Sequence, residues 1–140
     1  MSFWKKPDES ADYLSGVAFF EGFTSDELKR VAALSGELNV GSGAVVIDQG
    51  DTGVDCYVIV EGDASVRVRD EEVATLHSGD MVGEMALIDH RPRNASVVAT
   101  SDLRLLRFNS RQFRQLLAEM PKAEERVMTM LTERLRAEDE

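Results

Sequence analysis

The chain has 140 residues, of which 43% are hydrophobic and 30% charged, and its formal net charge at pH 7 is −10. These values predict one globular domain with a sizeable core, and the negative charge argues against nucleic acid as a partner, because phosphates would be repelled. The single cysteine, Cys56, excludes an internal disulfide framework. The start of the chain lacks the apolar run of a signal peptide, and no stretch approaches the roughly 20 apolar residues of a membrane span, so we expect a cytoplasmic protein.

The first part of the chain is predicted to be a lead-in followed by helices. Residues 1–12 are polar and carry Pro7, which predicts a flexible segment. The pattern of residues 13–36 is helical, and Thr24 and Glu27 have the spacing of a capping box at a helix start. We interpret this helix as a packing element.

Residues 37–109 change to short apolar runs separated by turns rich in glycine, serine and aspartate. We expect strands over residues 38–40, 44–47, 57–61, 64–68, 73–76, 97–99 and 103–108. Many short strands at spacings near ten residues predict an all-β barrel or jelly roll.

Residues 110–138 are predicted to form a pair of helices. Asn109 and Ser110 suit the start of the first helix, and Pro121 suits the first turn of the second. The second helix should gather apolar residues on one face, with its charged residues largely outside. The apolar set is Val127, Met128, Leu131 and Leu135.

The stretch over residues 82–96, Val-Gly-Glu-Met-Ala-Leu-Ile-Asp-His-Arg-Pro-Arg-Asn-Ala-Ser, contains the clearest functional signal. Gly83 permits a close approach to the main chain, and residues 84–88 suggest a short helical turn whose first N–H groups form an anion site. The guanidinium of Arg93 suits a phosphate. Because Glu84 would repel a phosphate, it suits a neutral sugar hydroxyl instead. Phosphate and sugar together indicate a nucleotide.

This stretch resembles the phosphate-binding cassette of the cyclic nucleotide-binding domain family. The family pattern runs aromatic-Gly-Glu-aliphatic-Ala-Leu, a short loop, and Pro-Arg-x-Ala-Ser/Thr, and the spacing from Gly83 to Ser96 matches it without a gap. The resemblance covers about residues 15–138. It implies a mainly β fold, in which an eight-stranded jelly-roll-like barrel over residues 37–109 is flanked by N-terminal helices and a C-terminal helix pair. The binding domain would then span residues 13–140.

The resemblance also assigns roles to individual residues. It implies that Glu84 binds the ribose 2′-hydroxyl, that Arg93 binds the cyclic phosphate, and that Gly83, Ala86 and Asn94 line the phosphate through their backbones. The expected ligand-binding residues are Val82, Gly83, Glu84, Met85, Ala86, Arg93, Asn94, Ala95 and Ser96.

Two residues depart from the family pattern. Val82 replaces the usual aromatic residue, which we interpret as a packing change. Asn94 stands where the family commonly carries alanine, or threonine in members that prefer cGMP, and this leaves the choice of base open. Because asparagine is common where a loop joins a strand, we expect Asn94 to face solvent and cAMP to be preferred over cGMP.

Other chemistries have weaker support. Asp48, Asp51 and Asp55 lack the spacing of a calcium loop. His77 and His90 are the only histidines, and they are not clustered as a metal barrel would need. No serine has a recognisable base and orienting group, so we expect no enzymatic activity, no metal and no cofactor beyond the nucleotide ligand.

The helices after residue 110 are the expected output of ligand binding. In the family such helices shift when ligand binds, so Val127, Met128 and Leu131 would cover the base or form the seam of a homodimer or partner complex, and Thr129 or Thr132 would reach the base. No winged helix follows residue 136, so we expect the output to lie in another polypeptide or in a dimer. A structural or partner-binding barrel without a nucleotide is the alternative function.

Overall fold

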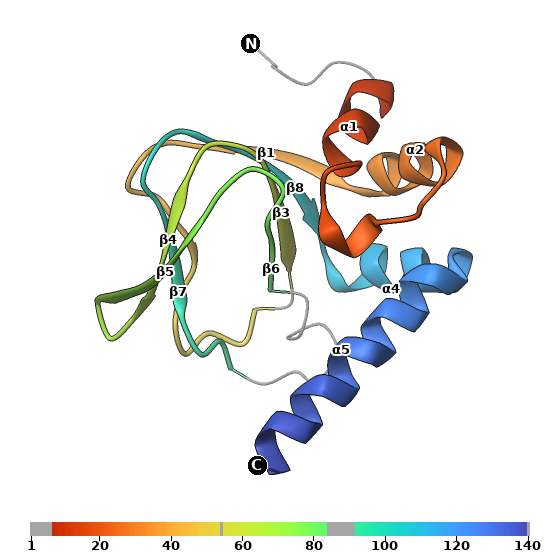
Figure 1. Ribbon diagram of the computed structural model, residues 1–140. Helices are drawn as coiled ribbons and strands as arrows, with labels where there is room; N and C mark the ends of the chain where they lie inside the picture. Colours follow the sequence, from red (N-terminus) through yellow and green to blue (C-terminus); the bar gives the residue numbers. More distant parts are fainter. Residues whose placement is uncertain (1–6, 54, 84–91, 140) are drawn as a thin grey trace.

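The computed structural model describes residues 7–53, 55–83 and 92–139. Within these residues, eight strands form two four-stranded antiparallel sheets (Figure 1). Sheet A has the order β1-β8-β3-β6 and sheet B the order β2-β7-β4-β5. The strands are β1 Gly36–Val40, β2 Val45–Ile47, β3 Cys56–Glu61, β4 Ala64–Val68, β5 Glu71–Leu76, β6 Met81–Val82, β7 Ser96–Ala99 and β8 Leu103–Phe108. The eight-stranded jelly-roll-like fold expected from the sequence is therefore confirmed.

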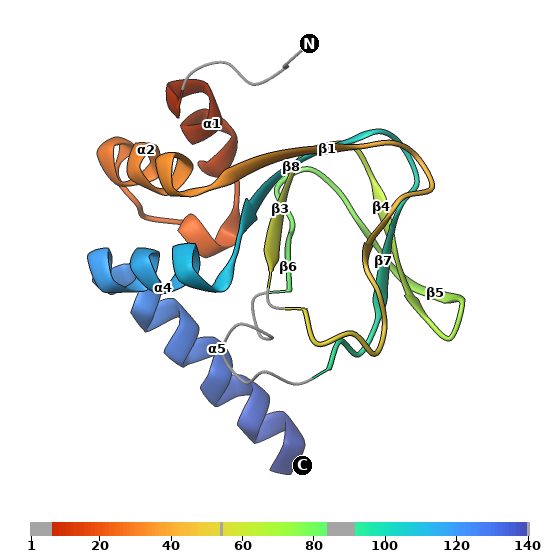
Figure 2. The same ribbon diagram turned by 180° about the vertical axis from the view of Figure 1, so that it is seen from behind.

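Sheet A lies between two apolar cores, because helices cover its outer face (Figure 2). Strand β3 shows this directly: Tyr57 and Ile59 face the core between the sheets, while Val58 and Val60 pack against the helices. A strand covered on both faces needs apolar residues at successive positions rather than in alternation. This explains why residues 56–60 are all apolar and all buried.

The N-terminal helices differ from the prediction at one end. The expected flexible lead-in over residues 1–12 is wrong from Pro7 onward, because α1 spans Pro7–Leu14. A proline is favoured in the first helical turn, and Leu14 is fully buried at the other end, so packing extends the helix further than the polar sequence suggests. A short 3-10 helix, η1 (Ala18–Phe20), and helix α2 (Ser25–Leu34) follow, and α2 begins with the predicted Thr24–Glu27 capping box.

The C-terminal pair consists of α4 (Ser110–Glu119) and α5 (Pro121–Asp139), with Asn109 capping α4 as predicted. Figure 1 shows α5 running from the helical side of the molecule past the end of the barrel. The second helix is less simply amphipathic than expected, because Val127 is buried in the helical core while Met128 is 55% exposed. The hydroxyls of Thr129 and Thr132 donate to carbonyls of their own helix.

Two cations of α5 hold its first half against the N-terminal helices. The guanidinium of Arg126, which the sequence placed on the outer face, donates to the carbonyl oxygens of Ala18, Phe19 and Glu21 around η1. One turn earlier, Lys122 Nζ lies 2.7 Å from Glu27 Oε1 and 3.0 Å from the Gly22 carbonyl oxygen. The position of α5 is therefore tied to the start of the chain.

Ion pairs between these helices should make stability fall in acid. Hydrogen bonds from Lys122 hold the pKa of Glu27 at about 2, and those from Arg30 do the same for Glu119. A carboxyl whose folded pKa is lowered stabilises the fold above its unfolded value near 4.5, and this contribution is lost as pH falls toward 2. We therefore expect the melting temperature to drop between pH 5 and pH 2.5.

The same titration on two variants tests this expectation by calorimetry. Glu119→Gln should flatten this drop in melting temperature, because the side chain that bonds Arg30 then no longer titrates. Glu125→Gln, which removes an exposed glutamate of α5 outside these two pairs, should leave the slope unchanged. Parallel curves for Glu119→Gln and wild type would contradict the assignment.

Candidate binding site for an anionic ligand

The main chain at Arg93 is fixed by the loop between β2 and β3. The Arg93 N–H donates to the carbonyl oxygen of Asp51 at 2.7 Å, and the Gly50 N–H donates to the carbonyl oxygen of Arg93 at 2.8 Å. This reciprocal pair holds Arg93 three residues before β7, as a short extension of the β2–β7 pairing. Gly50 has a φ of +91°, a backbone conformation that favours glycine at this turn.

The side chain of Arg93 turns inward and is only 9% exposed. Its Nη1 donates to the Gly83 carbonyl oxygen at 3.1 Å, and its Nη2 donates to the Asp55 carbonyl oxygen at 2.5 Å. Neutral carbonyls orient the guanidinium but do not neutralise it, and no carboxylate among the described residues forms an ion pair with it. A buried charge is costly unless it is paired, and among the described residues this guanidinium bonds only neutral carbonyl oxygens, which suits an anionic ligand.

Gly83 is required by the position of this guanidinium. Its φ is +88°, and a Cβ at this residue would lie 2.7 Å from Arg93 Nη1 and 2.8 Å from the Asp55 carbonyl oxygen. A side chain of any kind would therefore push the guanidinium away. The glycine that the sequence analysis chose for close approach to a ligand also makes room for the arginine.

Two cavities flank Arg93, and they differ in charge. The first, the loop cavity, has a volume of about 330 Å³ and includes Asp48, Asp51 and Asp55 in its wall. The second, the barrel cavity, has a volume of about 230 Å³, and no described residue in its lining is acidic. Its described lining residues are Ile47, Val66, Met81, Val82, Gly83, Arg93, Asn94, Ala95 and Val97. Among the described residues, the charges around the barrel cavity therefore suit an anion better than those around the loop cavity.

Tyr57 also lines the loop cavity. Burial raises the pKa of its phenol, and the charge of Asp55 raises it further, while Arg107 and Arg93 act in the opposite direction. The phenol therefore stays neutral at physiological pH, and it adds no negative charge beside Arg93.

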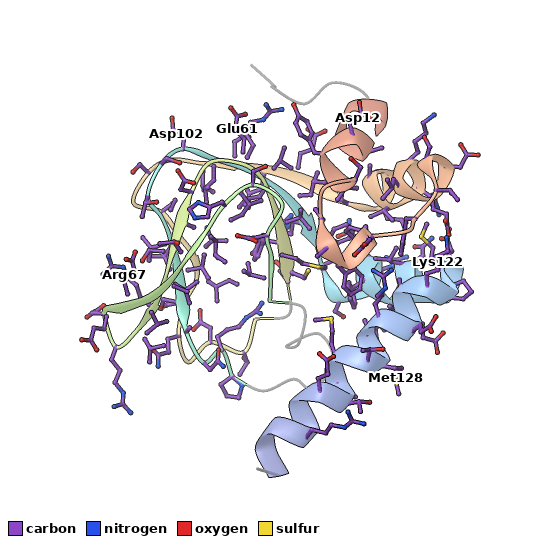
Figure 3. The ribbon with its side chains drawn as sticks, in the orientation of Figure 1. Asp12, Glu61, Arg67, Asp102, Lys122 and Met128 are labelled. Carbon is purple, nitrogen blue, oxygen red and sulfur yellow. The ribbon has the colours of Figure 1, made fainter. Side chains whose placement is uncertain are left out.

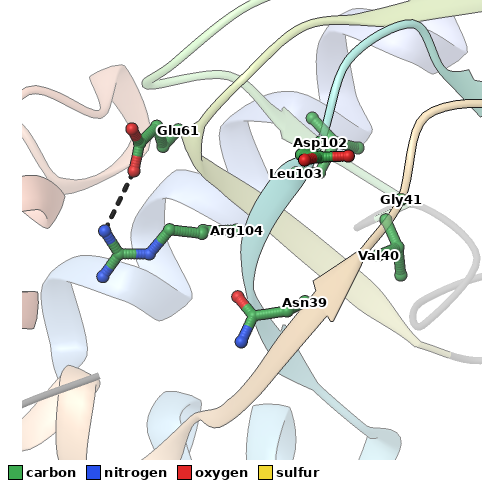
Figure 4. Close-up of a pocket in the computed structure, with 7 residues that line it drawn as sticks. All are labelled: Asn39, Val40, Gly41, Glu61, Asp102, Leu103 and Arg104. Carbon is green, nitrogen blue, oxygen red and sulfur yellow. Dashed lines mark hydrogen bonds and ion pairs between the residues drawn. The ribbon is translucent and has the colours of Figure 1, made fainter. Parts of the chain in front are cut away.

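A larger hollow, of about 560 Å³, lies at the other end of the sandwich (Figures 3 and 4). The Nη1 of its cation, Arg104, donates to Glu61 at 2.9 Å, and the carboxylate of Asp102 lies in the same wall (Figure 4). The positive charge in this hollow is therefore matched or exceeded by negative charge. This hollow is larger than both cavities beside Arg93, but its chemistry does not suit an anion.

The structure brings together five of the nine expected site residues around the barrel cavity: Val82, Gly83, Arg93, Asn94 and Ala95. Asn94 is exposed, as expected. The hydroxyl of Ser96 lies 2.9 Å from the Gln49 nitrogen, from which it accepts, and 3.4 Å from an oxygen of Asp48. Glu84, Met85 and Ala86, and the expected helical turn over residues 84–88, lie outside the described residues.

Sequence reasoning missed the residues of the β2–β3 loop. Gly50, Asp51 and Asp55 bond Arg93 through backbone atoms, and a backbone contact has no signature in residue type. The available signal was Gly50, whose φ of +91° belongs to the turn that bonds Arg93.

A comparison with known protein families finds a match over this region. The family model of the cyclic nucleotide-binding domain matches residues 37–120, which include every described residue around Arg93. The chain belongs to the cyclic nucleotide-binding domain family. The proposed cassette over residues 82–96 and both bonding partners of the Arg93 guanidinium lie inside the matched region.

Relatives in this family include regulatory and effector proteins. The chain is 35% identical over 117 residues to a cAMP-dependent protein kinase regulatory subunit of Mycosarcoma maydis, which covers 77% of this chain and 22% of the relative. It is 32% identical over 108 residues to the Pycsar effector protein XpPycTIR of Xanthomonas perforans, covering 76% of this chain and 36% of the relative. The chain thus spans about a third or less of these relatives.

Solved structures share the fold. The catabolite activator protein of Thermus thermophilus matches with a TM-score of 0.77 and 27% identity, covering 86% of this chain and 59% of that one. The regulatory domain of Toxoplasma gondii PKA, crystallised with cAMP, matches with a TM-score of 0.78 and 24% identity, covering 91% of this chain and 50% of that one. In the described part of the chain, the longest helices are too short or too polar to cross a membrane.

Proposed function

We propose that the chain is a regulatory module that binds a cyclic nucleotide, with cAMP preferred, and that it has no catalytic activity of its own. The observation that carries this proposal is the buried Arg93 guanidinium, which is oriented by two carbonyl oxygens and lies beside a cavity free of carboxylates among its described residues. In a protein of net charge −10, such a local positive site fits a phosphate.

The remaining contacts follow from family membership. Glu84 would accept a hydrogen bond from the ribose 2′-hydroxyl, and the backbones of Gly83, Ala86 and Asn94 would line the phosphate. Val82, Met85 and Ala95 would complete the pocket wall. The cyclic phosphate would occupy the barrel cavity beside Arg93, because the three carboxylates of the loop cavity would repel it.

Titration calorimetry with cAMP, cGMP and the cyclic pyrimidine nucleotides tests the proposal. We expect cAMP to bind most tightly, with a preference over cGMP of roughly tenfold, or about 1.4 kcal/mol. A preference for cGMP would overturn the assignment of the base. Binding of none of the four would favour the alternative function, a structural or partner-binding barrel.

The role of Glu84 is tested by removing the hydroxyl from the ligand. Glu84→Gln should weaken binding of cAMP far more than binding of 2′-deoxy-cAMP, because a carboxylate accepts a stronger hydrogen bond than an amide does. The deoxy analogue is the matched control, since it cannot form that bond with either variant. Equal losses of affinity for both ligands in calorimetry would make Glu84 a structural residue.

Transmission of the signal is proposed to run through α5. Its first half is bonded to η1 by Arg126, and its exposed Met128 offers an apolar contact to a second copy or to a partner protein. Ligand binding can act on such an element only if its positions in the bound and free states differ in affinity for the ligand. Val127 is already buried, so Met128 and Leu131 are the better candidates for this contact.

A further inference from the structure

Gln49 connects three parts of the molecule near Arg93. Its N–H donates to Ser96 Oγ on β7 at 2.9 Å, and its Oε1 accepts from the Arg69 N–H at 3.0 Å. The next two residues of the loop, Gly50 and Asp51, form the reciprocal backbone pair with Arg93. The β2–β3 loop thus bonds the main chain of Arg93, and Gln49 connects this loop to β7 and to the β4–β5 hairpin.

The Arg69 contact reaches the tip of the β4–β5 hairpin. Arg69 and Asp70 have φ values of +53° and +66°, in the left-handed region that residues other than glycine seldom adopt. A turn of this kind is held in place by its surroundings. The Gln49 amide provides one such contact, and Arg67 provides another by donating to the Asp70 carbonyl oxygen.

The β2–β3 loop has a physical reason to need this support. Asp48, Asp51 and Asp55 all line the loop cavity, and their like charges repel one another across it. Gln49 belongs to the same loop but is uncharged. Its N–H donates to Ser96 of β7, and its Oε1 accepts from the β4–β5 hairpin. Without these bonds, the loop would rely more heavily on its reciprocal backbone pair with Arg93.

We propose that Gln49 is a positioning residue for Arg93, and that Ser96 acts through it rather than on the ligand. By bonding β7 and the β4–β5 hairpin, Gln49 keeps Gly50 and Asp51 where they hold the Arg93 main chain. The guanidinium then meets the Gly83 and Asp55 carbonyl oxygens and faces the barrel cavity. This inference rests on the proposed function for its effect on affinity, but the bracing of the loop can be measured without any ligand.

The first measurement is amide hydrogen exchange by NMR on the ligand-free protein. Gln49→Met keeps the length of the side chain but removes the acceptor, so the amides of Gly50 and Arg93 should exchange about fivefold faster, which corresponds to a bond of about 1 kcal/mol.

The second measurement is cAMP affinity by calorimetry, with a matched pair of serine variants. Ser96→Ala removes the acceptor of the Gln49 N–H, which lies 2.9 Å away. Ser101→Ala is the control, because it removes an acceptor that lies at the same distance from a different donor, the Asp63 N–H. We expect Gln49→Met and Ser96→Ala each to weaken binding about threefold to tenfold. Ser101→Ala should leave the affinity at the wild-type value.

Each outcome decides the inference. Unchanged exchange at Gly50 and Arg93 in Gln49→Met would overturn the bracing, and faster exchange with unchanged affinity would make Gln49 a stabilising residue only. A larger loss of affinity in Ser96→Ala than in Gln49→Met, with wild-type exchange, would place Ser96 on the ligand. If the wild type binds no cyclic nucleotide, the proposed function fails, and wild-type exchange rates in Gln49→Met would still overturn the inference.

Discussion

Arg93→Ala is expected to remove most of the thermal stabilisation that cAMP gives to this protein. A ligand at 100 times its dissociation constant adds roughly 2.7 kcal/mol to the free energy of unfolding, and a chain of this size gains roughly 2–4 °C per kcal/mol. The wild type should therefore melt about 5–10 °C higher with cAMP. In the variant the phosphate meets a cavity without its cation, so the shift should nearly vanish.

Differential scanning calorimetry with and without cAMP measures this shift within each variant, so any change in ligand-free stability cancels. Arg114→Ala is the matched control, because it changes the net charge equally but removes an exposed guanidinium of α4 that bonds Ser110 of the same helix. It should keep the full wild-type shift. Equal shifts for wild type and Arg93→Ala would contradict the assignment of the phosphate.

Gly83→Ala is expected to weaken cAMP binding by roughly 10-fold to 150-fold. The added Cβ would lie 2.7 Å from Arg93 Nη1, so the guanidinium must leave its position. Losing a charge-assisted hydrogen bond costs about 1.5–3 kcal/mol, which converts to that range of affinity. Titration calorimetry measures the loss directly.

A second glycine separates this displacement from backbone strain. Gly43 has a φ of +92°, close to the +88° of Gly83, but a Cβ there would meet nothing within 4 Å. Gly43→Ala should therefore lower the melting temperature through the same unfavourable conformation while leaving the affinity unchanged. If both variants lose affinity to the same extent, the role of Gly83 is conformational and the contact with Arg93 is unimportant.

The fold was predictable from the sequence where the local signal and the packing agree. The capping residues Thr24 and Asn109 start helices at the expected positions, because a cap bonds its own helix and needs no distant partner. The strand expected over residues 64–68 likewise coincides with β4. The prediction failed at α1 and at Arg126, where burial of Leu14 and bonding to η1 depend on segments that are distant in sequence.

The candidate site was predictable only in part for the same reason. The motif identified Gly83 and Arg93, and the structure shows the two in contact. It could not identify the carbonyl oxygen of Asp55, which lies 38 positions before Arg93 in the sequence, because any residue type provides a carbonyl. The ligand contact expected for Ser96 stays a prediction, and in this structure its hydroxyl accepts from the Gln49 N–H.

The attachment of α5 near one end gives this helix the geometry of a lever. Arg126 bonds the carbonyl oxygens around η1, and the helix continues to Asp139, a distance of about 20 Å at 1.5 Å per residue. A tilt of about 10° around Arg126 would move the far end of the helix by roughly 3.5 Å, while Arg126 itself would move very little. If signal transmission runs through α5 as proposed, a small shift of η1 would become a larger movement at the far end of this helix.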